Sequence, residues 1–375
     1  MLGQHGSVDG QAKINVGIVG LGFGAEFVPI YKAHPNVERV GICELDEKRL
    51  NEIGDRHGVQ DRFSTFEELL DQPWIDAIHI LSTVPFHVEQ TLAVLNSGRH
   101  CACAVPMATD LEDLRRIVTA SRSSGRNYMM METMVYSRQF LYAKAMLDSG
   151  ELGNLTFLRG TYYQDVSGSY PRYWWAMPPM HYATHALGPV LALADTRATK
   201  VSCFGSGHLA PHIQQPGGNT FPLQTAIFRL EGTDVAVEVT RSWFQVARAY
   251  TEGFSVYGDK KGFEWQLESE DPIVFTLEPI RQNDRWRDAP GQRVKPPLRP
   301  DLYPPELAPY ADGWHGGSHP HLVHEFISSI VEGRPPRIDA VTAADWCAAG
   351  ICADLSSKRD GEMVEVPNFS GNPHP

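Results

Sequence analysis

The sequence has neither a surplus of positive charge nor a long apolar run. Its 33 lysines and arginines are outnumbered by 45 aspartates and glutamates, which gives a formal net charge of -12. Because a phosphate backbone is bound through clustered basic side chains, this balance argues against a nucleic-acid partner. No apolar segment has the length that spans a bilayer, and the N-terminal MLGQHGSVDGQAKIN lacks the apolar centre of a secretion signal. We therefore expect a cytoplasmic protein without nucleic-acid or membrane partners.

Cysteine is also scarce, and its spacing fits neither a disulfide framework nor a common metal site. The six cysteines all stand in apolar stretches: Cys43, Cys101, Cys103, Cys203, Cys347 and Cys352. We expect them to be reduced core residues. Four histidines gather around a Gly-Gly pair, namely His315, His319, His321 and His324. Since no cysteine or carboxylate spacing accompanies them, no metal site is predicted.

The chain is long enough for two domains, and its first 134 residues share one kind of pattern. Apolar segments alternate there with polar, amphipathic ones that end near a glycine, such as DEKRLNEIGDRHG and DLEDLRRIVTASRSSG. The apolar segments have the pattern of strands buried on both faces. They are NVGIVG, ERVGIC, IDAIHILS, RHCACAV and NYMMME. Strands that alternate with helices predict a doubly wound α/β sheet over residues 1–134.

The pattern changes after about Leu155, where longer segments alternate apolar and polar residues. These are LTFLRGTYYQDV, KVSCFGSGHL, LQTAIFRLEG, DVAVEVTRSWF and TEGFSVYGDKKGFEWQLE. The alternation predicts a mainly antiparallel open sheet with one covered face, in an α+β domain over residues 135–375. Two closing helices are expected, HLVHEFISSIVEG and AVTAADWCAAGICADLSSKRDG. The proline-rich segment Pro279–Trp314 is too long for a passive connector, so we expect a site-covering lid or an oligomer arm.

A glycine-rich turn follows the first expected strand and begins a helix. Glycines there let the backbone approach a pyrophosphate, whose charge the free N–H groups and the helix dipole stabilise. Glu44 ends the second strand, 20 residues after Gly24, where a carboxylate can accept hydrogen bonds from an adenosine ribose. The same carboxylate repels a 2′-phosphate, so the pattern predicts a Rossmann domain that binds NAD rather than NADP. The candidate cofactor residues here are Gly20, Gly22, Phe23, Gly24, Ala25 and Glu44.

A second turn, Ser82 to His87, begins a helix at the carboxyl edge of the predicted sheet. Ligands of open α/β sheets bind at this edge. We expect Thr83, Pro85 and His87 to lie on the nicotinamide side of the cofactor. For Thr83 and His87, capping of the following helix is the alternative.

The glycine-rich turn, the Thr83/Pro85/His87 turn, a helix opened by Pro106 and the C-terminal antiparallel region together resemble the Gfo/Idh/MocA oxidoreductases. The resemblance extends from about Ile14 to Pro367. It implies an NAD-dependent enzyme for a small sugar or cyclitol, and a homo-oligomer that associates through the second sheet.

Most members of that family have Glu-Lys-Pro before the helix, and their lysine lies beside the sugar hydroxyl that is oxidised. This chain has Ala104, Val105 and Pro106 instead. We expect Val105 and Pro106 to lie at the cofactor, but valine can neither accept nor donate a proton. The acid–base group must therefore come from elsewhere in the chain.

Two segments offer such groups. METMVYSR (131–138) follows the last strand of the first domain and is expected to bring Glu132 and Tyr136 into the crevice between the domains. HYATHALGP is expected to be helical, so that His181 and His185, at i and i+4, share one face of the helix. Most family members have an aspartate at the first of these positions and a histidine at the second.

Several segments are closer to one branch of the family, the NAD-dependent glycoside hydrolases exemplified by α-N-acetylgalactosaminidases. They are MMMETMVY, HYATHALGP, GWHGG and VEVPNFSG. That branch commonly has Glu-Val-Pro, so Val105 and Pro106 agree with it while Ala104 departs. Its chemistry implies that NAD accepts hydride from a ring carbon, usually C3. The C2 proton is then removed, the C1 group leaves, water adds, and the hydride returns. The resemblance implies His185 as the base for the C3 hydroxyl, Tyr136 as the base at C2, and His181 as support for either.

Aromatic and basic side chains offer a sugar site. The stretch Tyr170-Pro171-Arg172-Tyr173-Trp174-Trp175 suits a sugar platform, with burial under the proline-rich segment as the alternative. Arg138, Arg172 and Arg241 would together suit an anionic sugar such as a sulfoquinovoside; otherwise they are paired or solvated charges. The candidate substrate residues are Glu132, Arg138, Arg172, Trp174, Trp175, Tyr182 and His315.

Three functions remain open from the sequence. The favoured one is an NAD-dependent glycosidase that works by transient oxidation. The second is a net NAD-dependent sugar or cyclitol dehydrogenase whose base has moved to His185 or Tyr136. The third is a non-catalytic sugar- or dinucleotide-binding protein, which Ala104 and Val105 permit.

Overall fold

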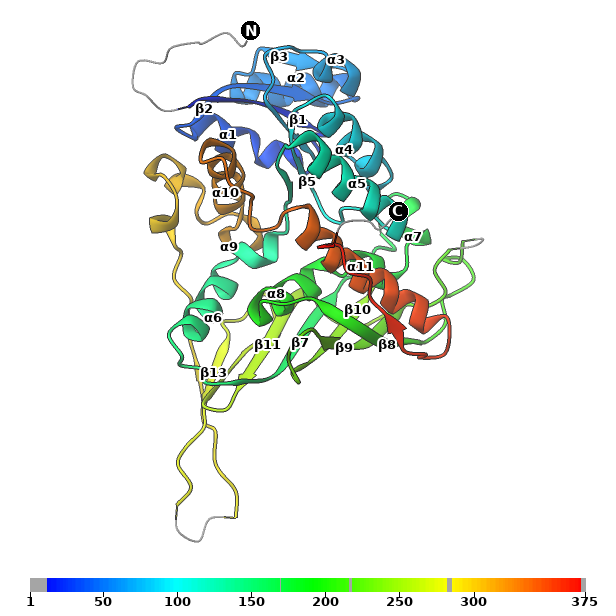
Figure 1. Cartoon of the computed structure of the whole chain (residues 1–375), viewed down its shortest axis with the longest axis vertical. Coiled ribbons are helices and arrows are strands. Elements are labelled where there is room, and N and C mark those ends of the chain that lie inside the picture. The colour runs from blue at the N-terminus through cyan, green and yellow to red at the C-terminus, as the bar shows by residue number, and fades with distance from the viewer. Residues whose placement is uncertain (1–11, 169, 216–217, 282–284, 372–375) are drawn as a thin grey trace. The chain divides into compact units, whose positions relative to one another are not determined.

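The computed structural model describes residues 12–168, 170–215, 218–281 and 285–371 (Figure 1). Most of the N-terminal segment used to argue against a secretion signal, residues 1–11, lies outside this part. The chain divides into two compact units. The first comprises residues up to Ala108, Arg115–Met131 and Arg299–Ala343. The second comprises Thr109–Leu114, Glu132–Leu298 and the residues from Ala344 onward.

The first unit is built on a six-stranded parallel sheet in the order β3-β2-β1-β4-β5-β6. The strands are β1 (Ile14–Val19), β2 (Val37–Cys43), β3 (Asp61–Phe63), β4 (Ala77–Ile80), β5 (His100–Cys103) and β6 (Tyr128–Met130). β4 is buried at every position, as expected for a strand covered on both faces. The predicted doubly wound sheet is confirmed. β3 was not expected, because it is short and begins with the polar pair Asp61 and Arg62.

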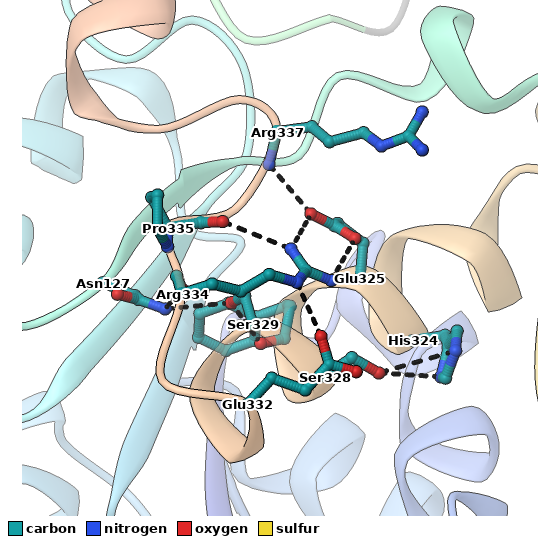
Figure 2. A network of polar contacts seen from close by, with 10 residues as sticks. Asn127, His324, Glu325, Ser328, Ser329, Glu332, Arg334, Pro335 and Arg337 are labelled. Atoms are coloured by element: carbon teal, nitrogen blue, oxygen red, sulfur yellow. Dashed lines mark hydrogen bonds and ion pairs between the residues drawn. The ribbon is translucent and has the colours of Figure 1, made fainter.

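Helices complete this unit at both faces of its sheet. They are α1 (Val28–Ala33), α2 (Glu47–His57), α3 (Phe66–Leu70), α4 (His87–Asn96), α9 (Trp314–Gly317) and α10 (His319–Val331), together with most of α5 (Leu111–Ser124). Short 3-10 turns accompany them: η1 (Gly24–Glu26), η2 (Val84–Phe86), η5 (Pro300–Leu302) and η6 (Pro305–Tyr310). α10 packs against α1. Its C-terminal end is tied to the start of β6 by Asn127, whose amide donates to Ser329 Oγ and to the carbonyl of Arg334 at 3.0 and 2.8 Å (Figure 2).

The second unit contains a nine-stranded sheet in the order β14-β13-β12-β11-β7-β10-β9-β8-β15. Its strands are β7 (Leu155–Tyr163), β8 (Ala198–Ser206), β9 (Leu223–Leu230), β10 (Ala236–Ser242), β11 (Thr251–Gly258), β12 (Lys261–Trp265), β13 (Ile273–Thr276), β14 (Gly291–Arg293) and β15 (Val364–Glu365). The mainly antiparallel sheet is confirmed, although β7 and β10 pair in parallel. β14 lies within the proline-rich segment and extends the edge of the sheet beside β13.

Helices cover one face of this second sheet. They include α6 (Arg138–Asp148), α7 (Tyr173–Ala176), α8 (Thr184–Ala194) and α11 (Ala340–Ser357), with the 3-10 turns η3 (Thr133–Tyr136) and η4 (Pro179–Tyr182). α8 lies directly against β7, β10 and β11 (Figure 1). This close packing requires Gly160, because a Cβ there would be 2.1 Å from the carbonyl oxygen of Ala186. The start of α8 is thereby held over the middle of the sheet.

The six cysteines are all buried, as expected of core residues. Among the residues that the structure describes, no helix is both long and apolar enough to cross a membrane. Within the same described ranges, no group of three or more His, Cys, Asp or Glu side chains is placed to hold a metal ion.

Candidate active site

The glycine-rich turn of the first unit connects β1 to η1 and α1. Gly20 has a φ of +86°, and a Cβ there would lie 2.6 Å from the carbonyl oxygen of Leu81. Only glycine fits this position. A Cβ on Gly22 would meet no atom within 4 Å, so the outer side of the turn is open for a ligand to approach the backbone. The turn therefore fits a pyrophosphate, as the sequence predicted.

Glu44 lies immediately after β2 and beside this turn. Its Oε2 accepts a hydrogen bond from the N–H of Leu21 at 2.9 Å, and its Oε1 accepts one from the N–H of Asp46 at 3.1 Å. Arg49 lies 3.4 Å from Oε2. Oε2 thus has two donors, whereas Oε1 has a further lone pair for a ribose hydroxyl. The position and charge of Glu44 thus fit the adenosine end of NAD.

His87 connects the Ser82 turn to the turn that carries Pro106. It is 1% exposed, and its Nδ1 and Nε2 lie 2.9 and 3.0 Å from the carbonyl oxygens of Pro106 and Ser82. Both acceptors need a donor, so the ring carries a proton on each nitrogen. Burial opposes this charge, but Cys103 and the two carbonyls raise the pKa of His87 to about 9. His87 therefore holds the two turns together as a buried cation.

Neither predicted cap of the following helix is present. Thr83 precedes η2 without a side-chain capping hydrogen bond, and His87 uses its ring on the two carbonyls instead. Val105 is buried at 6% exposure, next to the half-buried Ala104. This turn offers no ionisable side chain, in agreement with the sequence.

The structure places His315 in the first unit, close to the glycine-rich turn. His315 and the two glycines that follow it have φ values of 51°, 63° and 79°. The His315 ring lies edge-on to Phe23, with centroids 5.9 Å apart, and Phe23 also contacts His319. His315 was expected to bind sugar, and no pattern in the sequence indicated its contact with Phe23 of the cofactor turn.

The second unit contains a buried pair formed by Glu132 and His185. Nδ1 of His185, near the start of α8, lies 2.6 Å from Oε1 of Glu132, the residue before η3. Glu132 is fully buried, and the same oxygen accepts the N–H of Met134 at 3.0 Å. On the other side of the ring, Nε2 lies 4.0 Å from Oε1 of Glu252.

These two carboxylates set the protonation state of His185. Burial alone would lower its pKa, but Glu132 and Glu252 outweigh burial and raise the pKa to about 9. At neutral pH the ring is therefore an imidazolium, which donates hydrogen bonds and protons. The expected role of His185 as a base at C3 meets this obstacle, since the ring must first lose a strongly held proton.

Glu252 and Tyr250 are site residues that sequence reasoning missed. Tyr250 donates a hydrogen bond to Oε1 of Glu252. Glu252 pairs across the sheet with Tyr162 of β7, which in turn pairs with Arg241 of β10. The sequence feature that could have identified Glu252 is the alternation in TEGFSVYG. It puts Glu252 on the same strand face as the apolar side chains of Phe254 and Val256. A carboxylate on a buried face is a candidate functional group.

The expected shared helical face of His181 and His185 is wrong. His181 lies in η4, and Ala183, with φ of -103° and ψ of 6°, separates that turn from α8. The imidazole of His181 lies 3.4 Å from Asp354 of α11, whereas His185 contacts Glu132. The segment breaks because Pro178 and Pro179 begin a separate turn. Tyr136 ends η3, the turn that Glu132 precedes, and is 7% exposed.

The aromatic stretch packs largely within its own unit. Trp174 and Trp175 pack against a buried cluster of Val166, Leu209, Ile213, Trp243 and Phe244. Trp175 Nε1 donates to the carbonyl of Val166 at 3.1 Å. The ring of Tyr182 lies between Trp174 and His185, with centroids 4.9 and 5.6 Å away. Tyr182 is thus the member of this group closest to the buried pair.

Arg241 is committed to internal partners. Its guanidinium stacks 3.6 Å from the ring of Tyr162 and donates to the carbonyl of Tyr182 and to Gln164 Oε1 at 3.2 and 3.0 Å. Arg172 lies over Trp175 at 5.7 Å, and Arg138 begins α6. The three arginines therefore have different surroundings, and the structure does not unite them as a single fork.

Comparison with known proteins agrees with this geometry. Residues 14–132 match the GFO_IDH_MocA family model, described as "Oxidoreductase family, NAD-binding Rossmann fold". The fold and the turn thus define an NAD-binding domain of oxidoreductase type. More particularly, residues 14–132 are similar to the NAD-binding domain of the Gfo/Idh/MocA family, so the expected resemblance and the expected cofactor are confirmed.

Relatives aligned over nearly the whole chain carry a glycosidase name. A glycosyl hydrolase family 109 protein of Saccharopolyspora erythraea is 26% identical, and the alignment covers 96% of this chain and 85% of the relative. Glycosyl hydrolase family 109 protein 1 of Phocaeicola vulgatus is 23% identical, over 95% and 84% of the two chains. These names agree with the expected branch.

Solved structures share the fold. Levoglucosan dehydrogenase in complex with NADH and L-sorbose aligns with a TM-score of 0.79 and 20% identity, over 95% of this chain and all of that one. Myo-inositol 2-dehydrogenase from Lactobacillus plantarum aligns with a TM-score of 0.74 and 19% identity, over the same shares.

Proposed function

We propose that the protein is an NAD-dependent glycoside hydrolase that works by transient oxidation of a sugar carbon, usually C3. The observation that carries this proposal is the buried Glu132–His185–Glu252 group in a chain that has an NAD-binding turn. The glycosidase names of the relatives support the hydrolytic rather than the purely oxidative outcome. Bound NAD would take two electrons and a hydrogen from the ring carbon and return them later in the same turnover.

His185 acts in this proposal as a cationic hydrogen-bond donor to the sugar oxygen that changes charge. Glu132 fixes the orientation of the ring through Nδ1 at 2.6 Å. Removal of one such donor typically costs about 10²- to 10³-fold in rate. Tyr136 is assigned the C2 proton, whose acidity rises once C3 is a ketone. Loss of that proton expels the C1 group, and water adds before the ketone is reduced. His181 supports this group from η4 only indirectly, since it is paired with Asp354.

The first unit supplies the proposed cofactor contacts. The backbone of the glycine-rich turn would hold the pyrophosphate, and Glu44 would hold the adenosine ribose. The remaining proposed contacts toward the nicotinamide side are Thr83, Pro85, His87, Val105 and Pro106. Because His87 is bound to two carbonyls, it would act by fixing these turns.

The proposed substrate is a small-molecule glycoside, with Tyr182, Trp174, Trp175 and His315 among its contacts. An anionic sugar such as a sulfoquinovoside is the second candidate, and one observation favours it. Nε of Arg138 is buried and has no hydrogen-bond partner. An anionic group would satisfy that donor.

The test follows two products at once. The protein is incubated with NAD and a panel of neutral and sulfonated aryl glycosides, while aglycone release and NADH absorbance are recorded. Release without accumulation of NADH supports the proposal, and deuterium from D2O should then appear at C2 of the sugar. Stoichiometric NADH would instead show a sugar or cyclitol dehydrogenase. If neither signal appears although calorimetry shows NAD binding, the protein is a binding protein and the proposal fails.

A further inference from the structure

Glu252 is a carboxylate on the buried face of a strand. It is 1% exposed, and its neighbours on the same face of β11 are Phe254 and Val256. A buried charge is costly unless other groups compensate for it. Glu252 has two such groups at the same oxygen, Oε1: the hydroxyl of Tyr250, which donates to it, and Nε2 of His185 at 4.0 Å.

The charged and titratable groups that interact with Glu252 or with its partners come from several elements. They are Glu132 before η3, His185 of α8, Tyr182 of η4, Tyr162 of β7, Arg241 of β10 and Tyr250 before β11. With His185 protonated, the two carboxylates are balanced by the two cations, His185 and Arg241. The cluster is therefore neutral at rest, and one added proton would be accepted at a carboxylate.

Of the two carboxylates, Glu252 is the one that accepts a hydrogen bond from a partly exposed residue. Tyr250 is 42% exposed as a residue, and its phenol donates to the buried Oε1 of Glu252. Glu132 is fully buried, its Oε1 is occupied by His185 and by the N–H of Met134, and its Oε2 is buried without a hydrogen-bond partner. Burial, Tyr162 and Glu252 all raise the pKa of Tyr250, so the phenol is neutral at rest. It can therefore transfer its proton to Glu252 while it accepts another, without becoming a stable phenolate.

We propose that Glu252 is the proton acceptor of this site, reached through Tyr250, and that it supplies the acid–base function that Ala104 and Val105 lack. The inference rests on the proposed function. When the sugar hydroxyl is oxidised, the hydride on its carbon would pass to bound NAD, its O–H bond breaks, and a new O–H bond forms on Tyr250. The original phenol proton moves to Oε1 of Glu252, which becomes a neutral carboxylic acid. When the ketone is reduced, the same two protons move back, so the cycle leaves Glu252 ionised.

The test compares Tyr250 and Glu252 with a matched pair elsewhere in the sheet. Tyr257 donates to Glu264 at 2.7 Å in the same tyrosine–glutamate arrangement, away from His185. We measure kcat, KM and the pH profile of aglycone or NADH formation for Y250F, E252Q, E252D, Y257F and E264Q. Y250F and E252Q should lower kcat by about 10²- to 10⁴-fold with little change in KM. The acid limb of the kcat profile, where Glu252 takes up a proton, should disappear in E252Q and return in E252D.

The outcomes separate the inference from the proposed function. If the wild-type protein turns over no glycoside or sugar, the proposed function is overturned, and with it the proposed proton transfer through Tyr250 to Glu252. Two results in the presence of wild-type turnover overturn only the proposed proton transfer through Tyr250 to Glu252. One is that Y250F and E252Q are as active as Y257F and E264Q. The other is that E252Q keeps the acid limb. NAD affinity and melting temperature are measured for each variant. If E252Q does not fold, Y250F, which lacks only one hydroxyl, must show the loss of kcat by itself, and wild-type activity in Y250F overturns the inference.

Discussion

His185 and His87 are buried and charged, whereas His34 and His79 are buried and neutral, so the partners decide the state of each ring. His185 lies between two carboxylates, and His87 donates to two carbonyls. Burial dominates at His34 and His79 and lowers the pKa of each to about 3. The sequence identified His185 through its motif, but a motif does not reveal the charge that a folded environment imposes.

The prediction at this scale concerns the pair that holds His185. Replacing Glu132 with Gln removes the nearest negative charge, so the pKa of His185 should fall from about 9 toward its ordinary range. At pH values below its raised pKa, His185 is charged in the folded protein. Activity that depends on the imidazolium should therefore be lost as pH rises through about 9 in the wild type. In Glu132→Gln this basic limb should move to lower pH, as 15N NMR of the ring and the pH–rate profile would show.

The control is Glu89→Gln, which changes an exposed carboxylate paired with Arg116. It should leave both the basic limb and the 15N titration unchanged. An unshifted His185 titration in Glu132→Gln would contradict the assigned cause.

Glu44 allows a second prediction at residue scale, on cofactor choice. Its carboxylate should bind the ribose and repel a 2′-phosphate. Glu44→Gln should weaken NAD binding roughly 10- to 100-fold, the loss expected for one charged hydrogen bond, and should narrow the preference for NAD over NADP. Calorimetry with both nucleotides measures this. Glu47→Gln, an exposed position at the start of α2, serves as the control, and equal losses in the two variants would contradict the assignment.

At the scale of elements, the hydrophobic pattern predicted which segments form strands but not how all of them pair. The apolar runs predicted β1, β2, β4, β5 and β6 of the first sheet, and the alternating runs predicted β7 to β12. The parallel pairing of β7 with β10 depends on contacts about 80 residues apart, as between Leu158 and Val237, for which a local pattern carries no information. η4 was mistaken for helix because its histidine spacing matched a helical period, although Pro178 and Pro179 precede His181.

The prediction at this scale concerns the connection between α10 and β6 (Figure 2). Asn127→Ala would leave the carbonyl of Arg334 and Ser329 Oγ without their amide donor. The expected loss is about 1 to 3 kcal/mol of unfolding free energy, measured as a lower urea midpoint. Gln60→Ala, at an exposed loop position, is the control. A midpoint equal to that of the control would show that water replaces Asn127 without cost.

At the scale of the molecule, composition and the change of pattern near residue 134 predicted two parts of different type. No local pattern indicated that residues 299–343 would group with the first unit, because that grouping depends on distant contacts such as Met130 N–H to the carbonyl of Ile338. Likewise, the cluster around His185 combines residues of α8, η4, β7, β10 and β11 with Glu132 from the segment before η3. Only Glu132, His185, Tyr182 and Arg241 could be singled out from the sequence.

The expected homo-oligomer stays a prediction at this scale. Phe204 and Ile227 are 56% and 45% exposed on neighbouring strands of the second sheet. Exposed apolar side chains on an open sheet face are typical of subunit contacts. Light scattering should give a mass that is a multiple of 41.7 kDa, and Ile227→Lys should lower it, whereas Arg229→Lys on the same strand should not. A monomeric wild type would rule the oligomer out.

Acid should unfold the first unit before the second. Burial lowers the pKa of His34, His79 and His319 to about 3. A histidine whose folded pKa is depressed contributes stability that is complete above its ordinary pKa of about 6.5 and is lost as pH falls toward the folded value. Each such ring adds a slope of up to about 1.4 kcal/mol per pH unit between those limits. In the second unit, by contrast, His185 has a raised pKa and loses no stability on this account as pH falls from 7 to 4.

Hydrogen exchange followed by mass spectrometry at stepped pH measures this order. Peptides from β1, β4 and α10 should lose protection between pH 6 and 4, while β7 and β11 remain protected. His79→Gln removes one titrating ring from the core of the first unit. The protection of β4 should therefore fall less steeply with decreasing pH in that variant. Two results would contradict this explanation: loss of protection in β7 and β11 before β4, or an unchanged slope of β4 protection against pH in His79→Gln. Either would show that protonation of the buried neutral histidines does not limit the stability of the first unit in acid.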